Sequence, residues 1–414
     1  MEESVVGEMH SVGAAAADLD RDDPLAAIRA RFVPASDVVA YLDGNSLGRP
    51  LAVTSTRMAE FVRDRWGGRL IRGWDEGWME APERLGDELG RVVLGAAPGQ
   101  TVIGDSTSVL LYKAVRAAVA AQEGRDELVF AAADFPTDRF VLQGIAAELG
   151  LRLVPIATPH DDGVRPEQVA AVVGPRTAAV VLSHVAYRSG TITDAAGTTA
   201  AAHAGGALTV WDLSHSVGVL PLELDAWDAD LAVGCGYKYL NGGPGAPAFL
   251  YARRDLLPRL LQPIQGWMGA DEPFAMGDRY RPDPGIRRFL SGTPSILAMQ
   301  PIADMLAVID EVGVPAIRAK SVQLTRAATE WADRDLAPLG ATLAGPRDPA
   351  RRGGHITVDH PAFPSILPAL HARGVVPDFR RPDGIRIGLS PLSTSFAELE
   401  AGVAVIRDEL ARRV

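Results

Sequence analysis

A lysine, an aspartate and a histidine stand in two neighbouring segments of the sequence. In WDLSHSVG, Asp212 ends a short apolar run and His215 comes three residues later; in GCGYKYLNGGPG, Lys238 lies between two tyrosines. A lysine can trap an aldehyde as a Schiff base when apolar neighbours remove part of its water shell and polar groups flank it. The pattern therefore indicates amine chemistry on a carbonyl group.

Pyridoxal phosphate is a cofactor that uses these residue types together. It needs a lysine for its aldehyde, a carboxylate for its pyridine nitrogen, and a cup of N–H and hydroxyl groups for its phosphate. GDSTSVLLYKAV predicts such a cup, because Ser106, Thr107 and Ser108 precede a helical pattern whose N-terminus attracts anions. Phe135, in ADFPTD, could stack on the pyridine ring. Each feature alone is more often a helix cap or a turn, but their order along the chain favours a cofactor site.

Short apolar runs that alternate with helical stretches must position these side chains. The runs cover residues 127–133, 151–157, 177–185, 207–212 and 229–236. Unbroken apolar strands separated by helices are typical of a mostly parallel sheet that is covered on both faces. Ligands bind at the carboxyl ends of strands in such sheets, which is where Asp212 and Lys238 fall. The sequence predicts an α/β fold.

Four consecutive parts are expected along the chain. Residues 1–24 are acidic and alanine-rich and are predicted to form a flexible arm, and residues 25–100 a helical segment that packs with the small domain. Residues 101–300 should form the large α/β domain. Residues 301–414 combine long helical patterns with a few alternating segments, which predicts a smaller α+β domain.

Composition disfavours several classes of function. The 414 residues carry 41 Lys and Arg against 52 Asp and Glu, and the net charge of −11 argues against nucleic-acid or anionic-membrane partners. No apolar run approaches the roughly 18 residues of a spanning helix, and the N-terminus shows no secretory pattern. The single cysteine, Cys235, permits no internal disulfide, and a cytoplasmic location is expected. No metal site is expected either, since metal-ligand spacing is missing among His160, His203, His355, His360 and His371.

In its motifs the sequence resembles kynureninase, a family in the fold-type I, aspartate aminotransferase-like class of pyridoxal phosphate enzymes. The resemblance runs from YLDGNSLGRP (41–50) to GIRIGLSPL (384–392). It is carried by DGNSLG, LIRGWDEGW with PERLGD, FPTDRF, WDLSHSVG and GYKYLNGGPG in that order. The resemblance implies a large domain with a mostly parallel central sheet, a smaller C-terminal domain, and a homodimer with active sites at the subunit interface.

The resemblance also implies roles for individual residues. Lys238 would bind the cofactor aldehyde, Asp212 would hold the pyridine nitrogen, and Arg386 would grip the substrate α-carboxylate with its two-pronged guanidinium. Ser46 and Trp74 are weaker candidates for substrate contacts. The other implied cofactor contacts are Ser106, Thr107, Phe135, Asp138, Ser183, His215, Tyr237, Trp267 and Thr293, the last two from the neighbouring subunit.

The implied activity is hydrolytic cleavage of the Cβ–Cγ bond of L-kynurenine or 3-hydroxy-L-kynurenine. The products are L-alanine and the anthranilate, as in tryptophan catabolism or NAD biosynthesis. Lys238 would move the α-proton, and Tyr237 would polarise the γ-carbonyl of the substrate.

Other activities could use the same scaffold. A cysteine desulfurase-like lyase needs a nucleophilic cysteine on a flexible loop, whereas Cys235 lies in an apolar run three residues before Lys238. An aminotransferase or epimerase could use the same lysine, aspartate and arginine, and only the segments around Ser46 and Trp74 speak against it. A non-catalytic protein that binds the cofactor should lack these groups, so the sequence favours an enzyme.

Overall fold

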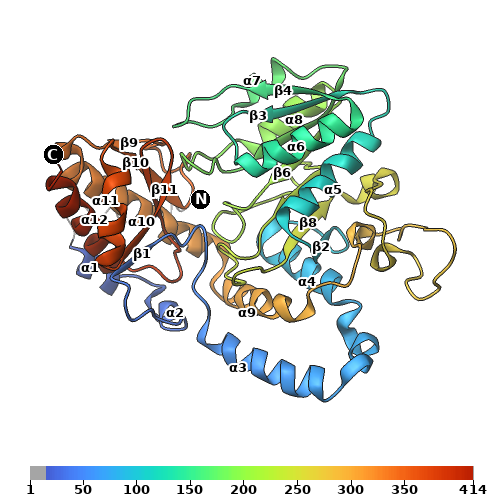
Figure 1. Ribbon diagram of the computed structural model, residues 1–414, viewed down its shortest axis with the longest axis horizontal. Coiled ribbons are helices and arrows are strands. Elements are labelled where there is room, and N and C mark those ends of the chain that lie inside the picture. The colour runs from blue at the N-terminus through green and yellow to red at the C-terminus, as the bar shows by residue number, and fades with distance from the viewer. Residues whose placement is uncertain (1–14, 414) are drawn as a thin grey trace, which may run out of the picture.

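The computed structural model describes residues 15–413, which form a large and a small domain side by side (Figure 1). The large domain contains a seven-stranded sheet. In spatial order its strands are β2 (Thr101–Gly104), β8 (Ala248–Ala252), β7 (Leu231–Gly234), β6 (Leu208–Asp212), β5 (Thr177–Ser183), β3 (Glu127–Ala131) and β4 (Arg152–Ile156). The run from β7 to β4 is parallel, and β8 is antiparallel to both of its neighbours, so the predicted mostly parallel sheet is confirmed.

Apolar side chains leave both faces of this sheet, as its unbroken apolar strands predict. In β3, Leu128 and Phe130 join one buried cluster, whereas Val129 and Ala131 join the other. The first cluster lies under α5 (Thr107–Ala120) and α6 (Pro136–Leu149). The second lies under α4 (Ala81–Leu89), α7 (Pro166–Ala170), α8 (Ala195–Ala204) and α9 (Ile296–Val312).

Local sequence explains where the site-bearing helix α6 begins and ends. Pro136 occupies its first turn, where a fixed φ suits the helix and the missing N–H costs nothing. Gly150 ends it with a φ of 70°, a conformation that glycine adopts without steric cost.

The direction of the chain reverses within the sheet between β3 and β5. From β3 the chain moves outward to β4, whereas from β5 it moves the opposite way to β6 and β7. The carboxyl ends of strands at such a reversal leave a crevice for ligands. Phe135, Ser183, Asp212 and Lys238 all follow or end these strands.

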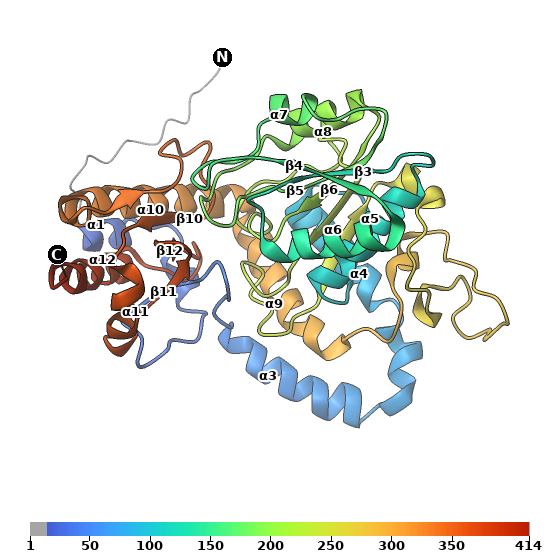
Figure 2. The same ribbon diagram turned by 45° about the horizontal axis from the view of Figure 1, so that its top comes forward.

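The small domain contains a five-stranded sheet with helices packed on it (Figure 2). Its strands in spatial order are β1 (Ala40–Leu42), β11 (Val375–Arg380), β12 (Gly384–Gly388), β10 (His355–Asp359) and β9 (Thr342–Leu343). All pairs are antiparallel except β1 with β11. The helices of its core are α1 (Ala16–Arg21), α10 (Val314–Asp335), α11 (Phe363–Ala372) and α12 (Phe396–Ala411).

The predicted domain limits need three corrections. The flexible arm is wrong for residues 16–23: α1 buries Ala16 in the small-domain core, and Asp23 forms a buried ion pair with Lys320. The rest of the arm, residues 1–14, lies outside the described part. Residues 25–100 divide between the domains, because β1 joins the small sheet while α4 packs on the large one. Finally, α9 and the first turn of α10, with Val314 and Ile317, join the large-domain core, so the small domain begins within α10.

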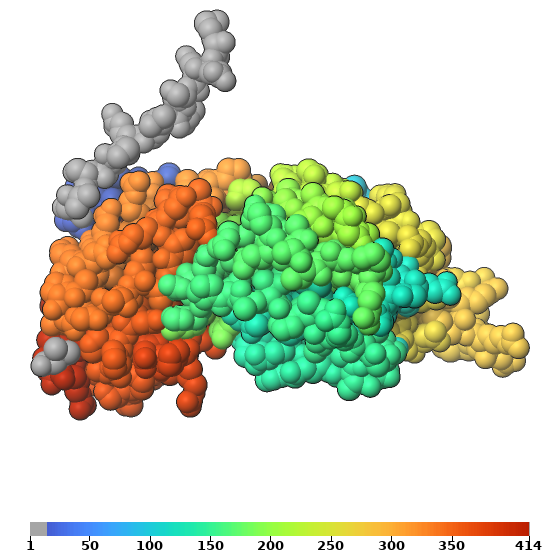
Figure 3. Space-filling model, turned by 90° about the horizontal axis from the view of Figure 1, so that it is seen from above, coloured from blue at the N-terminus to red at the C-terminus, as the bar shows by residue number. Residues whose placement is uncertain are grey.

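Two helices of the N-terminal part, α2 (Ala26–Arg29) and α3 (Ala52–Glu60), stand before and after β1 in the sequence. The helix α3 extends below the large domain in Figure 2 and contacts α9. At the far end of the large domain, residues 265–281 project from the surface (Figure 3). Among residues 15–413, no helix has both the length and the apolar composition that crossing a membrane requires.

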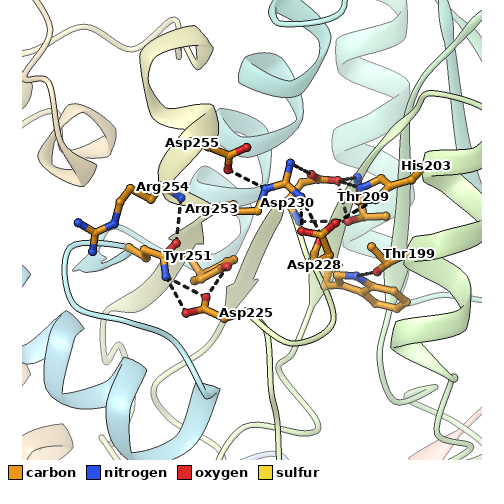
Figure 4. A network of polar contacts seen from close by, with 12 residues as sticks. Thr199, His203, Thr209, Asp225, Asp228, Asp230, Tyr251, Arg253, Arg254 and Asp255 are labelled. Carbon is orange, nitrogen blue, oxygen red and sulfur yellow. Dashed lines mark hydrogen bonds and ion pairs between the residues drawn. The ribbon is translucent and has the colours of Figure 1, made fainter.

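A polar network connects the amino ends of β6 and β7 with the carboxyl end of the antiparallel strand β8 (Figure 4). The buried Asp230 accepts hydrogen bonds from the N–H and hydroxyl of Thr209, and its carboxylate contacts His203 at 2.7 Å and Arg253 at 3.3 Å. Because a buried carboxylate needs such partners, the network holds these strands in one register.

Candidate active site

A pocket of about 260 Å³ collects most of the predicted site residues. It lies at the carboxyl ends of the large-domain strands and is closed on one side by strands of the small domain. Ten of the predicted residues line it: Ser46, Thr107, Phe135, Asp138, Ser183, Asp212, His215, Tyr237, Lys238 and Arg386.

Lys238 and His215 contact each other at the centre of this pocket. The ammonium Nζ of Lys238 lies 2.9 Å from Nε2 of His215. Burial, then the nearby Lys238 and Arg386, lower the pKa of His215 well below its usual value, so its imidazole is neutral. A neutral imidazole nitrogen can accept a hydrogen bond from the ammonium group, which holds the lysine toward the pocket.

The carboxyl groups of Asp134, Asp138 and Asp212 lie close enough to influence one another. Asp212 ends β6, and its Oδ1 accepts a hydrogen bond from the backbone N–H of Ser214 at 2.8 Å. Burial, followed by the charges of Asp212 and Asp134, raises the pKa of Asp138 well above its usual value. Burial likewise raises the pKa of Asp134 to about 7. Asp212, which ends β6 and lines the pocket, remains the predicted partner of a protonated ring nitrogen.

The N-terminus of α5 forms one wall of the pocket. Thr107 and Ser108 line it, and Oγ1 of Thr107 is buried without a hydrogen-bond partner among the described residues. A buried hydroxyl that lacks a partner is costly unless a ligand satisfies it. Together with the helix N-terminus, this hydroxyl fits the phosphate of pyridoxal phosphate. Ser106 precedes the helix, makes no side-chain cap bond, and is exposed outside the pocket.

Arg386 approaches the pocket from the small domain. Its side chain is only 1% exposed, and burial lowers its pKa. One guanidinium nitrogen donates to the hydroxyl of Ser46 at 2.6 Å and the other to the carbonyl of Tyr187 at 2.8 Å. The substrate-side candidates Arg386 and Ser46 are thus in direct contact, although 340 positions separate them in the sequence.

Three further predicted residues lie elsewhere in this chain. The rings of Trp74 and Trp267 meet edge to face with centroids 6.3 Å apart, and Trp267 lines the hollow beside the projecting segment 265–281. Thr293 is exposed on the approach to α9. None of the three lines the pocket of the same chain.

The pocket also contains residues that the sequence analysis missed. Tyr187 follows β5, its ring meets that of Phe135 edge to face at 5.4 Å, and Arg380 lies over its other side at 5.6 Å. Thr137, Val185 and Ser214 complete the lining. The sequence could have indicated Arg380. Asp378 and Arg380 are two residues apart on β11, and Asp378 lies opposite Arg386 on β12, so all three side chains lie on the same face of the small sheet.

The one cysteine of the chain does not serve this pocket as a reactive thiol. No group of three or more metal-ligating side chains is found within residues 15–413. Cys235 is 1% exposed beneath the site, and burial raises the pKa of its thiol. A buried thiol of raised pKa is a poor nucleophile, which disfavours the desulfurase alternative.

Comparisons with known proteins identify relatives that match almost the whole chain. Residues 317–406 match the family model of the kynureninase C-terminal domain. Kynureninase from Pseudomonas fluorescens is 38% identical over 405 residues, covering 95% of this chain and 94% of its own. Kynureninase from Burkholderia pseudomallei (strain 1106a) is 39% identical over 401 residues, with the same coverage.

Solved structures share the fold at much lower identity. The apo cysteine desulfurase from Thermococcus onnurineus NA1 superimposes with a TM-score of 0.81 at 19% identity, covering 94% of this chain and 98% of the other. That likeness concerns the fold alone. From the near full-length relatives, the chain belongs to the kynureninase family.

Proposed function

We propose that this protein is a pyridoxal phosphate-dependent hydrolase that cleaves the Cβ–Cγ bond of L-kynurenine or 3-hydroxy-L-kynurenine to L-alanine and the anthranilate. The observation that carries the proposal is that Lys238 and Arg386, from different domains, line one pocket in a chain whose full-length relatives are named kynureninase. An amine for the cofactor and a guanidinium for a carboxylate are the two anchors that an amino-acid substrate needs.

The pocket residues would supply the main contacts of the cofactor within one chain. Lys238 would bind its aldehyde, Asp212 its pyridine nitrogen, and Thr107 with the N-terminus of α5 its phosphate. Phe135 would cover one ring face, and Ser183, Asp138 and Tyr237 would add polar contacts. When bound, pyridoxal phosphate withdraws electrons from the bonds at the amino acid's α-carbon.

The chain's own groups then bind the substrate and move protons. Arg386 would hold the α-carboxylate, with Ser46 beside it. Lys238 would act as the base for the α-proton, and the neutral His215 can accept a hydrogen bond from it. Burial raises the pKa of Tyr237, so its hydroxyl stays protonated and can donate a hydrogen bond to the γ-carbonyl.

A homodimer is part of the proposal. Exposed apolar side chains gather between α3 and the large domain at Val62, Trp66, Leu70 and Ile71, of which Ile71 is 76% exposed. Such surfaces mark interfaces more often than free surface. Trp267 and Thr293, which do not line the pocket of their own chain, would then contact the cofactor of the neighbouring subunit.

A cytoplasmic location and a small amino-acid substrate complete the proposal. Their support is the single buried cysteine and the absence of a bilayer-spanning helix among the described residues. The pocket volume of about 260 Å³ suits a small ligand.

The decisive experiment adds L-kynurenine to the purified protein loaded with pyridoxal phosphate and follows anthranilate fluorescence. 3-Hydroxy-L-kynurenine is tested in parallel, and Lys238→Ala is the control. Equal amounts of anthranilate and alanine, lost in the lysine variant, support the proposal. A protein that binds the cofactor but cleaves neither compound contradicts it.

A further inference from the structure

The guanidinium of Arg386 is already engaged where a substrate carboxylate would bind. Its Nη2 lies 2.6 Å from Oγ of Ser46 and 2.6 Å from Oδ2 of Asp378, and its Nη1 donates to the carbonyl of Tyr187. A carboxylate that binds arginine with both oxygens uses either the Nη1–Nη2 edge or the Nε–Nη2 edge. Both modes need Nη2, so a substrate must displace one of its present neighbours.

Asp378 has a second arginine within reach. Nε of Arg380 lies 2.7 Å from Oδ2 of Asp378, the same oxygen that contacts Arg386. Asp378 is paired with Arg386 across β11 and β12, and Arg380 stands two residues further along β11. The guanidinium of Arg380 is also held over the ring of Tyr187. One carboxylate therefore lies between two positioned cations.

Two carboxylates cannot share Arg386 without cost. The Arg386 side chain is 1% exposed and that of Asp378 is 16% exposed, so little water screens the charges there. Like charges at such short range repel strongly where water is largely excluded. Asp43, whose Oδ1 lies 3.7 Å from Nη2 of Arg386, adds to the negative charge that faces an arriving carboxylate.

We propose that Asp378 is a place-holding carboxylate, which pairs with Arg386 in the free enzyme and moves fully onto Arg380 when the α-carboxylate of a substrate takes Nη2. The inference rests on the proposed function, in which Arg386 is the carboxylate-binding residue. In this exchange Asp378 lies beside an arginine both before and after binding, and the substrate carboxylate takes its place on Arg386. Asp378 is a positioning residue here, and it makes binding selective for ligands that carry a carboxylate.

Two single variants test this exchange with opposite expected effects on ligand affinity. Asp378→Asn keeps the shape but removes the competing charge, so L-alanine should bind about fivefold to tenfold more tightly. Arg380→Gln removes the alternative partner and leaves Asp378 on Arg386, so binding should weaken by a similar factor. The double variant should bind like Asp378→Asn, because a neutral amide no longer needs Arg380.

Equilibrium binding to the holoenzyme is the readout, followed by the change in the cofactor's absorption spectrum. L-Alaninamide, which lacks the carboxylate, is the matched ligand control and should respond little to either variant. For L-kynurenine, KM should move in the same directions as the dissociation constant for alanine and change more than kcat.

Each contrary result has a distinct meaning. If both single variants bind alanine more weakly, Asp378 only orients Arg386. If all variants bind alanine equally well, Asp378 does not compete with the ligand. Either result overturns the exchange. Equal affinity for L-alanine and L-alaninamide overturns it too, because Arg386 then does not recognise the carboxylate. A wild-type protein that binds L-alanine but does not cleave L-kynurenine refutes the proposed function alone, and the binding data still decide the exchange.

Discussion

Nζ of Lys238 lies 2.9 Å from Nε2 of His215, although the two residues follow different strands and are 23 positions apart. The contact exists because β6 and β7 are adjacent and parallel, which brings the residues after their carboxyl ends together. The neutral imidazole gives the ammonium group a fixed acceptor inside the pocket.

Replacement of His215 should therefore reduce catalysis in a way that depends on the acceptor. His215→Leu leaves the lysine without its partner, and kcat/KM for L-kynurenine should fall by about tenfold to a hundredfold, the usual range for a lost bond to a charged group. His215→Gln offers an amide oxygen and should retain more activity. Steady-state kinetics decide, with cofactor content measured by absorption. Equal losses in both variants would contradict an acceptor role.

The hydroxyl of Thr107 should matter for cofactor affinity. Thr107→Val keeps the shape but removes the buried oxygen that has no partner within the described chain, so the dissociation constant for pyridoxal phosphate should rise about tenfold. Thr107→Ser retains the hydroxyl and is the control. Titration of the apoenzyme, followed by protein fluorescence, measures both. Unaltered affinity in the valine variant would show that the phosphate lies elsewhere.

His184 should make the protein sensitive to acid. Its ring is buried between Trp211 and Trp227, and burial lowers its pKa from 6.5 to about 4. The unfolded chain takes up a proton below pH 6.5 whereas the folded chain does so only near pH 4, so stability falls across this window as the pH is lowered. The loss is about 3 kcal/mol by linkage. Urea unfolding of wild type and His184→Leu between pH 7 and 4 checks this. The decrease in the free energy of unfolding between these two pH values should be smaller in the variant.

His203 should show the opposite dependence on pH. Its hydrogen bond to the buried Asp230 raises its pKa above 6.5, so this pair stabilises the fold fully below pH 6.5 and loses effect as the pH rises through the raised value. Thermal unfolding of His203→Gln against wild type should show a destabilisation at pH 6 that narrows by pH 9. If the variant is destabilised to the same extent at pH 6 and pH 9, the charge on His203 does not contribute to stability.

The buried pair of Asp23 and Lys320 should be essential for the small domain. The two side chains are 3% and 2% exposed, and the ammonium of Lys320 also lies 4.6 Å from the ring centre of Phe396. Asp23→Ala leaves a buried cation without its carboxylate and should cost about 3–5 kcal/mol. The double variant Asp23→Leu with Lys320→Met should recover most of that loss. Chemical denaturation measures all three, and a small effect of Asp23→Ala would refute the structural role of this residue.

Much of the site could be predicted from the sequence because its residues follow apolar strands. Asp212 and Lys238 stand where continuous apolar runs end, and the Ser/Thr turn before α5 begins an amphipathic helix. These are local patterns, and the periodicity of the strands requires a covered parallel sheet. The motif order then indicated the family, which the full-length relatives confirm.

Local patterns failed where a residue's partner is remote. The sequence predicts an acidic arm at α1, because nothing near this helix shows that Ala16 meets a core made mostly by residues after 323. The helix α9 was placed in the wrong domain for the same reason, since its apolar face suits either core. Amphipathic periodicity tells which face is buried but not against which element.

The sequence by itself determined the α/β class, the order of strands and helices, and the residue types that can hold a cofactor and an amino acid. Only the tertiary structure decided that Ser46, Tyr187, Asp378 and Arg380 surround Arg386, because these contacts join positions up to 340 residues apart. Buried charges are compensated by the groups that lie near them in space, and the spacing of residues in the sequence does not fix those distances.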